Sequence, residues 1–108
     1  MNRVKIVTFV PLASADEVRQ ALGMAGAGKI GEYSYCSYSV TGKGRFTPSG
    51  DANPYIGTVN TPEIVEEERI EVVCERESAK AVIEAMKQAH PYEEVAFDVY
   101  QLLDEEEL

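Results

Sequence analysis

The stretch Arg69-Ile-Glu-Val-Val-Cys-Glu-Arg-Glu-Ser-Ala-Lys-Ala-Val-Ile-Glu-Ala-Met86 decides the fold. From Ile64 to Cys74 the chain has strand character, with Ile70, Val72 and Cys74 on one face and Arg69, Glu71 and Val73 on the other, which predicts a strand. From residue 79 to 86 the apolar residues change to helical spacing, with a period of about 3.6. His90-Pro91 ends this helix, because the residue before a proline avoids the α region. A strand followed by an amphipathic helix is therefore expected here.

The N-terminal part of the chain repeats this plan. Residues 3–10 alternate as a strand does, and Pro11 stops them. Ser14-Ala-Asp-Glu17 has the pattern of a capping box, which predicts a helix start. Apolar residues at helical spacing follow, and Gly26 is placed to end the helix. This half also predicts a strand and then a helix.

Two further strands and a long loop complete the reading. Residues 33–40 and 95–100 alternate and are expected to be strands. Residues 41–63 are rich in glycine and proline and have no periodicity, so we expect a loop. Loops longer than about 12–15 residues in a compact domain are commonly functional or disordered.

The order β-α-β, loop, β-α-β predicts an α+β fold, a ferredoxin-like βαββαβ sandwich with an antiparallel four-stranded sheet and both helices on one face. Residues 1–103 are expected to form this single domain, and 104–108 an acidic C-terminal tail. The other face would carry tyrosine, serine, arginine and glutamate, which favours self-association. We expect Arg69 to pair with a carboxylate of Glu94, Asp98 or another subunit.

Composition limits the function. The formal net charge of −9 argues against nucleic-acid binding. No apolar run approaches the roughly 20 residues of a membrane helix, and the start lacks a signal-peptide pattern, so we expect a cytoplasmic protein. Cys36 and Cys74 lie in strand-like stretches and are expected to be reduced thiols.

Two glycine-rich stretches are candidates for binding anions. Gly26-Ala-Gly-Lys-Ile-Gly31 matches a dinucleotide motif, but it follows a helix and precedes a strand, the reverse of what that motif needs, so we expect no cofactor. Its amides and Lys29 could still hold a small anion. Gly42-Lys-Gly-Arg-Phe46 places Lys43 and Arg45 among glycines, which suits a phosphate or carboxylate, although an exposed loop with ordinary solvated charges is the simpler explanation.

His90 is the single histidine. With Cys36 and Glu93 it could form a nucleophilic set, but no oxyanion-hole pattern accompanies Cys36, so catalysis is not expected. The same three residues are weak metal candidates, because one histidine without paired-ligand spacing rarely forms a metal site. We expect His90 to cap its helix and to bond locally, and its place at a helix C-terminus favours the protonated form.

Three stretches together resemble a known family: Gly26-Ala-Gly-Lys-Ile-Gly-Glu-Tyr-Ser-Tyr-Cys36, Gly42-Lys-Gly-Arg-Phe-Thr-Pro48 with Asn53-Pro-Tyr-Ile-Gly57, and His90-Pro-Tyr-Glu-Glu-Val-Ala-Phe-Asp-Val-Tyr100. They are similar to the YqfO-type domain inserted in bacterial members of the Nif-three-like family, over residues 4–102. That domain is similar in fold to PII proteins and CutA, which are trimers. The flanking segments that carry the family's dinuclear metal site have no counterpart here, so neither that site nor a hydrolase activity is implied. The chain looks like the insertion domain standing alone.

The expectation is therefore a non-catalytic, homo-oligomeric binding or regulatory module, a trimer rather than a dimer, with a small anionic ligand between subunits. No nucleic acid, membrane or cofactor is expected. A CutA-like metal-binding protein and a purely structural domain are the alternatives. The residues expected to bind the ligand are Lys29, Tyr33, Cys36, Lys43, Arg45, Tyr55, His90, Glu93 and Glu94.

Overall fold

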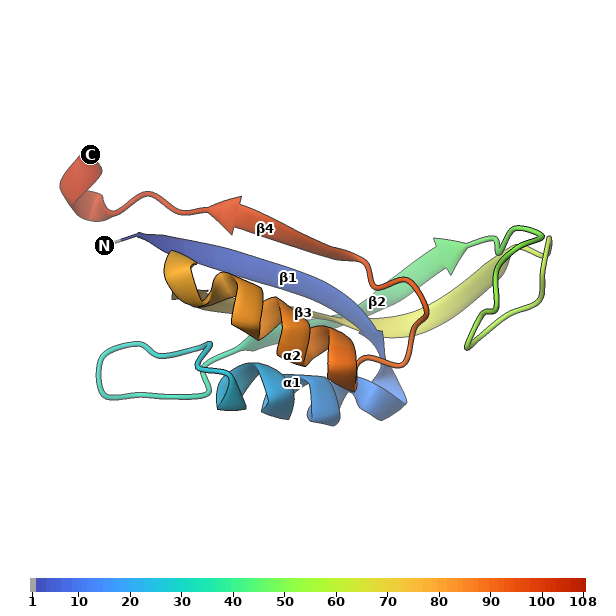
Figure 1. The fold of residues 1–108 in the computed structure, drawn as a ribbon, viewed down its shortest axis with the longest axis horizontal. Coiled ribbons are helices and arrows are strands. Elements are labelled where there is room, and N and C mark those ends of the chain that lie inside the picture. Colours follow the sequence, from blue (N-terminus) through green and yellow to red (C-terminus); the bar gives the residue numbers. More distant parts are fainter. Residues whose placement is uncertain (1) are drawn as a thin grey trace.

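The computed structural model describes residues 2–108 of the chain, and over these residues four strands form one antiparallel sheet with both α-helices on one face (Figure 1). The sheet order is β2-β3-β1-β4, which confirms the predicted ferredoxin-like fold. The elements are β1 (Arg3–Pro11), η1 (Leu12–Ser14), α1 (Ala15–Met24), β2 (Tyr38–Phe46), β3 (Glu63–Glu75), η2 (Arg76–Ser78), α2 (Ala79–Ala89), β4 (Phe97–Gln101) and η3 (Glu105–Glu107).

The core lies between the sheet and the two helices. The register pairs Val4 with Cys74 and Ile6 with Val72, so alternate residues of the two central strands face the helices. Burial of each such aliphatic side chain contributes about 1.5–3 kcal/mol, and this layer holds the helices on the sheet. The buried core residues include Val4, Ile6, Val10, Val18, Leu22, Ile70, Val72, Cys74, Val82 and Met86.

The two ends of α1 differ in how well they were predicted. The prediction of a capping box at Ser14 is wrong, because the Ser14 side chain makes no cap hydrogen bond. A 3-10 turn, η1, leads directly into α1 instead, and the amide of Ala15 donates to the carbonyl of Leu12. The end was predicted correctly: Gly26 follows the helix with a φ of +103°, a conformation that glycine adopts without strain.

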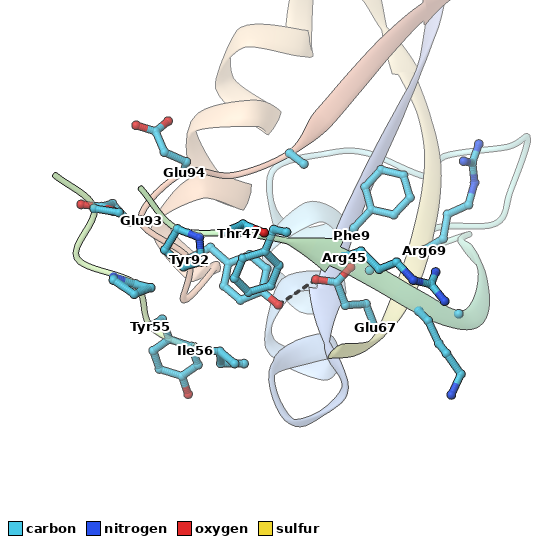
Figure 2. A pocket seen from close by; sticks show the side chains of 18 of the residues that line it. Phe9, Arg45, Thr47, Tyr55, Ile56, Glu67, Arg69, Tyr92, Glu93 and Glu94 are labelled. Atoms are coloured by element: carbon cyan, nitrogen blue, oxygen red, sulfur yellow. Dashed lines mark hydrogen bonds between the residues drawn. The ribbon is translucent and has the colours of Figure 1, made fainter. Parts of the chain in front are cut away.

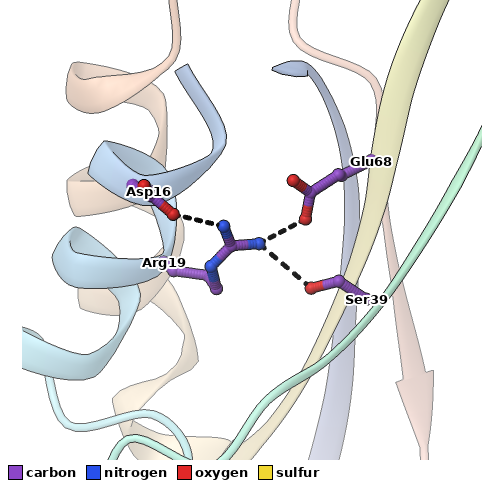
Figure 3. Close-up of polar contacts among 4 residues, drawn as sticks. All are labelled: Asp16, Arg19, Ser39 and Glu68. Atoms are coloured by element: carbon purple, nitrogen blue, oxygen red, sulfur yellow. Dashed lines mark hydrogen bonds and ion pairs between the residues drawn. The ribbon is translucent and has the colours of Figure 1, made fainter. Parts of the chain in front are cut away.

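Arg19 holds α1 against the sheet (Figure 3). Its guanidinium donates to Glu68 on β3, to Oγ of Ser39 on β2 at 3.1 Å, and to Oδ1 of Asp16 at 2.5 Å. These hydrogen bonds, first to Glu68 and then to Asp16, raise the pKa of Arg19. One side chain therefore joins a helix to both strands of the β2–β3 hairpin.

The second strand lies further along the chain than its sequence pattern predicts. The structure has β2 at Tyr38–Phe46, so residues 41–46 are strand, and the expected loop 41–63 is shortened to residues 47–62. Gly42 pairs with Glu67 and Gly44 with Val65, so these glycines belong to the ladder of hydrogen bonds between β2 and β3.

Residues 28–37 form a separate excursion before β2. The amide of Gly28 donates to the carbonyl of Val73, and the amide of Cys36 donates to the carbonyl of Gly28. Cys36 is therefore not in a strand.

The hairpin β2–β3 extends past the helices as an arm, and the chain measures 48 × 26 × 23 Å. Loop 47–62 lies at the far end of the arm, at the same end of the molecule as the C-terminus of α2 (Figure 1). The excursion 28–37 lies at the opposite end. Among the residues that the structure describes, no helix is long and apolar enough to span a membrane.

Candidate ligand-binding groove

A groove of about 670 Å³ lies where the arm meets the segment between α2 and β4. Three parts of the chain line it: the strand face turned away from the helices, loop 47–62, and segment 90–96 (Figure 2). This volume is within the range of small-molecule sites. The lining includes Phe9, Val40, Gly42, Lys43, Gly44, Arg45, Phe46, Pro48, Ala52, Pro54, Tyr55, Ile56, Glu67, Arg69, Tyr92, Glu93, Glu94 and Ala96.

Glu67 places a carboxylate in this largely apolar groove. Its side chain comes from β3, and the residue is only 8% exposed. The hydroxyl of Tyr92 donates to its Oε2 at 2.7 Å (Figure 2). Burial, and next the hydrogen bond to Glu67, raise the pKa of Tyr92, so this phenol stays protonated and acts as a donor.

Aromatic rings surround this pair. The ring of Tyr92 lies 6.3 Å from that of Phe46 and 6.4 Å from that of Tyr55, centroid to centroid, in tilted arrangements. Such tilted pairs are the favoured geometry of aromatic side chains. Tyr92 therefore links the arm, loop 47–62 and segment 90–96 into one wall.

His90 supports the groove from behind rather than lining it. The amide of Tyr92 donates to His90 Nδ1 at 3.2 Å, so the ring proton is on Nε2, which donates to the carbonyl of Phe9 at 2.7 Å. The bond with Tyr92 is the expected local one, whereas the bond with Phe9 joins residues that are 81 apart in the sequence. The expectation of a favoured protonated form is wrong, since burial lowers the pKa of this ring. Both nitrogens are occupied by backbone groups.

Segment 90–96 is fixed at several points. Besides the contact of His90 with Phe9, the hydroxyl of Thr8 donates to the carbonyl of Ala96 at 3.0 Å, so both ends are held by β1. The carboxylate of Glu93 accepts from the amide of Asn53 at 3.0 Å and ties the segment to loop 47–62. Glu93 therefore builds the groove wall, and Glu94 is exposed at its rim.

Three cations border the groove. Lys43 and Arg45 are exposed on the arm. The guanidinium of Arg69 lies 5.6 Å from the centre of the Phe9 ring and donates to Glu71 at 3.2 Å. The side chains of Tyr100 and then Glu71 raise the pKa of Arg69. Arg69 is thus paired with a carboxylate, as expected, but the partner is Glu71 on its own strand and not Glu94 or Asp98.

The structure divides the expected ligand set. Lys43, Arg45, Tyr55, Glu93 and Glu94 line the groove, and His90 lies behind it. Lys29, Tyr33 and Cys36 lie in the excursion at the other end of the molecule (Figure 1). The excursion joins β3 at Val73, six residues from Glu67 and therefore about 20 Å along the strand.

The weak metal candidates are not brought together. Cys36 is at the excursion, whereas His90 and Glu93 are beside the groove. Over residues 2–108, no group of three or more histidine, cysteine, aspartate or glutamate residues has a metal-binding arrangement.

Phe9 and Glu67 lie outside every stretch expected to wall the site, whereas Phe46 and Tyr92 lie inside the expected walls 42–57 and 90–94 without being named as ligand-binding residues. Glu67 is hidden in the run Glu66-Glu67-Glu68, which has the appearance of a solvated charged surface. The alternation of Gly42 and Gly44 was the available signal, because a Cβ at residue 44 would lie 2.0 Å from Oε1 of Glu67. A strand with every second residue glycine leaves room for a side chain from its neighbour.

No family model matches the chain. A Halalkalibacterium halodurans protein named GTP cyclohydrolase 1 type 2 homolog is 48% identical over 103 residues, covering 95% of this chain and 28% of that protein. A Bacillus subtilis protein of the same name is 51% identical over 96 residues, covering 89% of this chain and 26% of that protein. The chain thus spans about a quarter of these relatives.

Solved structures agree with the sequence relatives. A Bacillus cereus protein related to NIF3 matches with a TM-score of 0.84 and 48% identity, over 95% of this chain and 26% of that one. CutA1 from Pyrococcus horikoshii matches with a TM-score of 0.69 and 16% identity, over 94% and 84%. A Bacillus subtilis GlnK–ATP complex matches with a TM-score of 0.63 and 15% identity, over 94% and 82%. At such identities the last two show a shared fold alone.

Proposed function

Because the chain is homologous to one domain-sized segment of the Nif-three-like family, as its three motifs predicted, we propose that it is a binding or regulatory module that holds a small ligand in the groove of Figure 2. The observation that carries this proposal is the construction of the groove. Three separate parts of the chain converge on it, and a buried carboxylate lies among aromatic rings at their junction. A few polar groups in an apolar concavity are typical of ligand sites.

A non-catalytic role is part of this proposal. His90 has both ring nitrogens bonded to backbone groups, so neither is left to activate a nucleophile such as the hydroxyl of Thr47, which lines the groove. The name of the relatives refers to a cyclohydrolase, but the chain spans about a quarter of their length. We place any catalysis by those proteins in their remaining parts.

We propose in addition that copies of this chain associate with one another. The sheet face opposite the helices carries the side chains of Tyr38, Val40 and Tyr100, all large and each more than 40% exposed. Apolar surface of this kind supports an interface between copies of the chain, and the resemblance to PII and CutA favours a trimer. The groove opens on the same face, through Phe9 and Val40, so a neighbouring copy would border it. The formal net charge of −9 supports a module without nucleic-acid partners.

Native mass spectrometry of protein purified without a tag tests both parts. We expect a trimer that carries a non-peptide mass, and we expect the Tyr55→Ala variant to lose that mass. The Tyr55 side chain lines the groove and is 60% exposed, so its removal should alter the groove and leave the fold intact. A bare trimer that takes up nothing from a deproteinised cell extract would overturn the ligand-binding part. A monomer at micromolar concentration would overturn the self-association part.

A further inference from the structure

We propose that the groove recognises a planar group with an amidine-type edge, that is, two adjacent N–H donors in the plane of the group, and that Glu67 accepts hydrogen bonds from this edge. The inference rests on the proposed ligand-binding role of the groove and specifies the chemistry of its ligand. This ligand class differs from the small anion that Lys43 and Arg45 suggested from the sequence.

The first observation is the incomplete hydrogen bonding of Glu67. An ionised carboxylate has about four acceptor positions, and a buried one needs partners to offset its desolvation. Within residues 2–108, the hydroxyl of Tyr92 is the one donor found on Glu67, and no lysine or arginine forms an ion pair with it. Arg69, the nearest cation along β3 that lines the groove, is paired with Glu71.

The second observation is the position of the other carboxylate oxygen. Oε1 lies where a side chain of residue 44 would begin, 2.0 Å from an ideal Cβ, so only glycine leaves this place open. Gly42, the next residue on the same face of β2, has no atom within 4 Å of its ideal Cβ. The carboxylate therefore lies over bare backbone at the groove, with Tyr92 bonded to one oxygen only.

The third observation is the shape of the surrounding wall. The rings of Phe9, Phe46, Tyr55 and Tyr92 all line the groove, together with aliphatic residues such as Val40 and Ile56. Aromatic faces stack on planar groups and attract positive charge. A ligand that is flat, carries N–H donors at one edge and is otherwise apolar satisfies both the carboxylate and the rings.

Two kinds of molecule share this edge. One is a guanidinium group on an alkyl chain, and the other is a 2-amino-pyrimidinone ring, as in guanine. Both present paired N–H groups that match the two oxygens of a carboxylate. A lone phosphate or carboxylate has no N–H group to donate and would leave the open acceptor positions of Glu67 unfilled.

Calorimetric titration with three probes tests the inference. Agmatine carries the guanidinium, guanosine carries the ring edge, and inosine lacks the 2-amino group of guanosine. The proteins are the untagged wild type, Glu67→Gln and the control Glu66→Gln, which changes an exposed residue next to it on β3. Glutamine at 67 retains an acceptor for Tyr92 but presents an amide NH₂ to the ligand in place of the second oxygen.

We expect agmatine or guanosine to bind the wild type and Glu66→Gln alike, and to bind Glu67→Gln at least tenfold more weakly, because the variant replaces a charged acceptor oxygen with an amide donor. If guanosine is the ligand type, inosine binds the wild type at least tenfold more weakly, a comparison that needs no variant. Equal binding to Glu67→Gln, or no binding of agmatine and guanosine, would overturn the inference. If native mass spectrometry still shows a ligand that Tyr55→Ala loses, the proposed function stands and only the amidine-type chemistry fails.

Discussion

The hydroxyl of Tyr92 donates to Oε2 of Glu67 at 2.7 Å and so joins the segment after α2 to the middle of β3. Twenty-five residues separate the two in sequence, and between them lies the whole of α2. The contact fixes the position of the aromatic wall, because the rings of Phe46, Tyr55 and His90 all lie around that of Tyr92.

Tyr92→Phe removes this donor and keeps the ring. Because Glu67 is buried, its carboxylate would be left without its protein donor, and we expect a loss of about 1–3 kcal/mol in the free energy of unfolding. Urea denaturation followed by circular dichroism measures it. Tyr55→Phe is the control, since Tyr55 is 60% exposed, and we expect a change of no more than about 0.5 kcal/mol. Equal stability of Tyr92→Phe and wild type would mean that the bond does not stabilise the fold.

Gly44→Ala and Gly42→Ala form a matched pair on one face of β2. A Cβ at residue 44 would lie 2.0 Å from Oε1 of Glu67, whereas one at residue 42 would meet nothing within 4 Å. We expect Gly44→Ala to displace the carboxylate from Tyr92 and to destabilise by about 1 kcal/mol. Gly42→Ala should be neutral or stabilising by up to about 0.5–1 kcal/mol, because alanine loses less backbone entropy. Denaturation midpoints decide this, and the same sign in both variants would contradict it.

Local sequence patterns determine part of this fold, and contacts between distant segments determine the rest. The order of elements, the end of α1 at Gly26 and the end of α2 at His90 follow from periodicity and from the conformational limits of glycine and of residues before proline. The extent of β2 does not, because Gly42 and Gly44 have the composition of a loop and become strand through pairing with β3. Composition cannot show that pairing.

The candidate site was predicted in part for the same reason. Lys43, Arg45 and Tyr55 are in a stretch whose glycines and prolines mark it as unusual, and they do line the groove. The sequence does not distinguish Glu67 from Glu66 and Glu68. Glu67 is buried because it pairs with Gly42 on the neighbouring strand and because the Tyr92 side chain contacts its carboxylate. Lys29, Tyr33 and Cys36 were grouped with the others because sequence patterns do not tell which end of the sheet a loop occupies.

The stability of the protein should depend on pH through His90. Its pKa is lowered in the folded state, chiefly by burial, so between that value and the unfolded value near 6.5 the unfolded chain binds more protons. Stability is then full above about pH 6.5 and falls as the pH decreases below it, by at most about 1.4 kcal/mol per pH unit. Urea midpoints from pH 7.5 to 5.5 test this. His90→Gln should flatten the profile, and an equally steep profile in that variant would assign the effect to another group.

Arg19→Met should loosen α1 from the hairpin. The variant retains an apolar stem but leaves Glu68, which is largely buried, without its cation, and we expect a loss of about 1–2 kcal/mol. Asp16→Asn is the control, because the Asp16 side chain is 97% exposed and exposed ion pairs contribute about 0–1 kcal/mol. Thermal unfolding of both variants measures the difference. A larger effect in Asp16→Asn than in Arg19→Met would contradict the bridging role of Arg19.

Tyr38→Lys should dissociate the proposed oligomer without unfolding the protomer. Tyr38 is 65% exposed on the sheet face opposite the helices, and a lysine there would lie across from Glu71 and remain compatible with the strand pairing. Tyr33→Lys, in the excursion, is the control and should keep the wild-type mass in light scattering. If both variants retain that mass, the interface lies elsewhere.

The central claim is that the groove between the arm, loop 47–62 and segment 90–96 is the binding site. The most direct test is a ¹H–¹⁵N correlation spectrum of the labelled, untagged protein before and after addition of a deproteinised small-molecule extract of cells. We predict shifts concentrated at groove amides such as those of Gly42, Gly44 and Tyr55, and nearly unchanged signals for Lys29 and Cys36. Shifts confined to the excursion 28–37, or no shifts at all, would contradict the account.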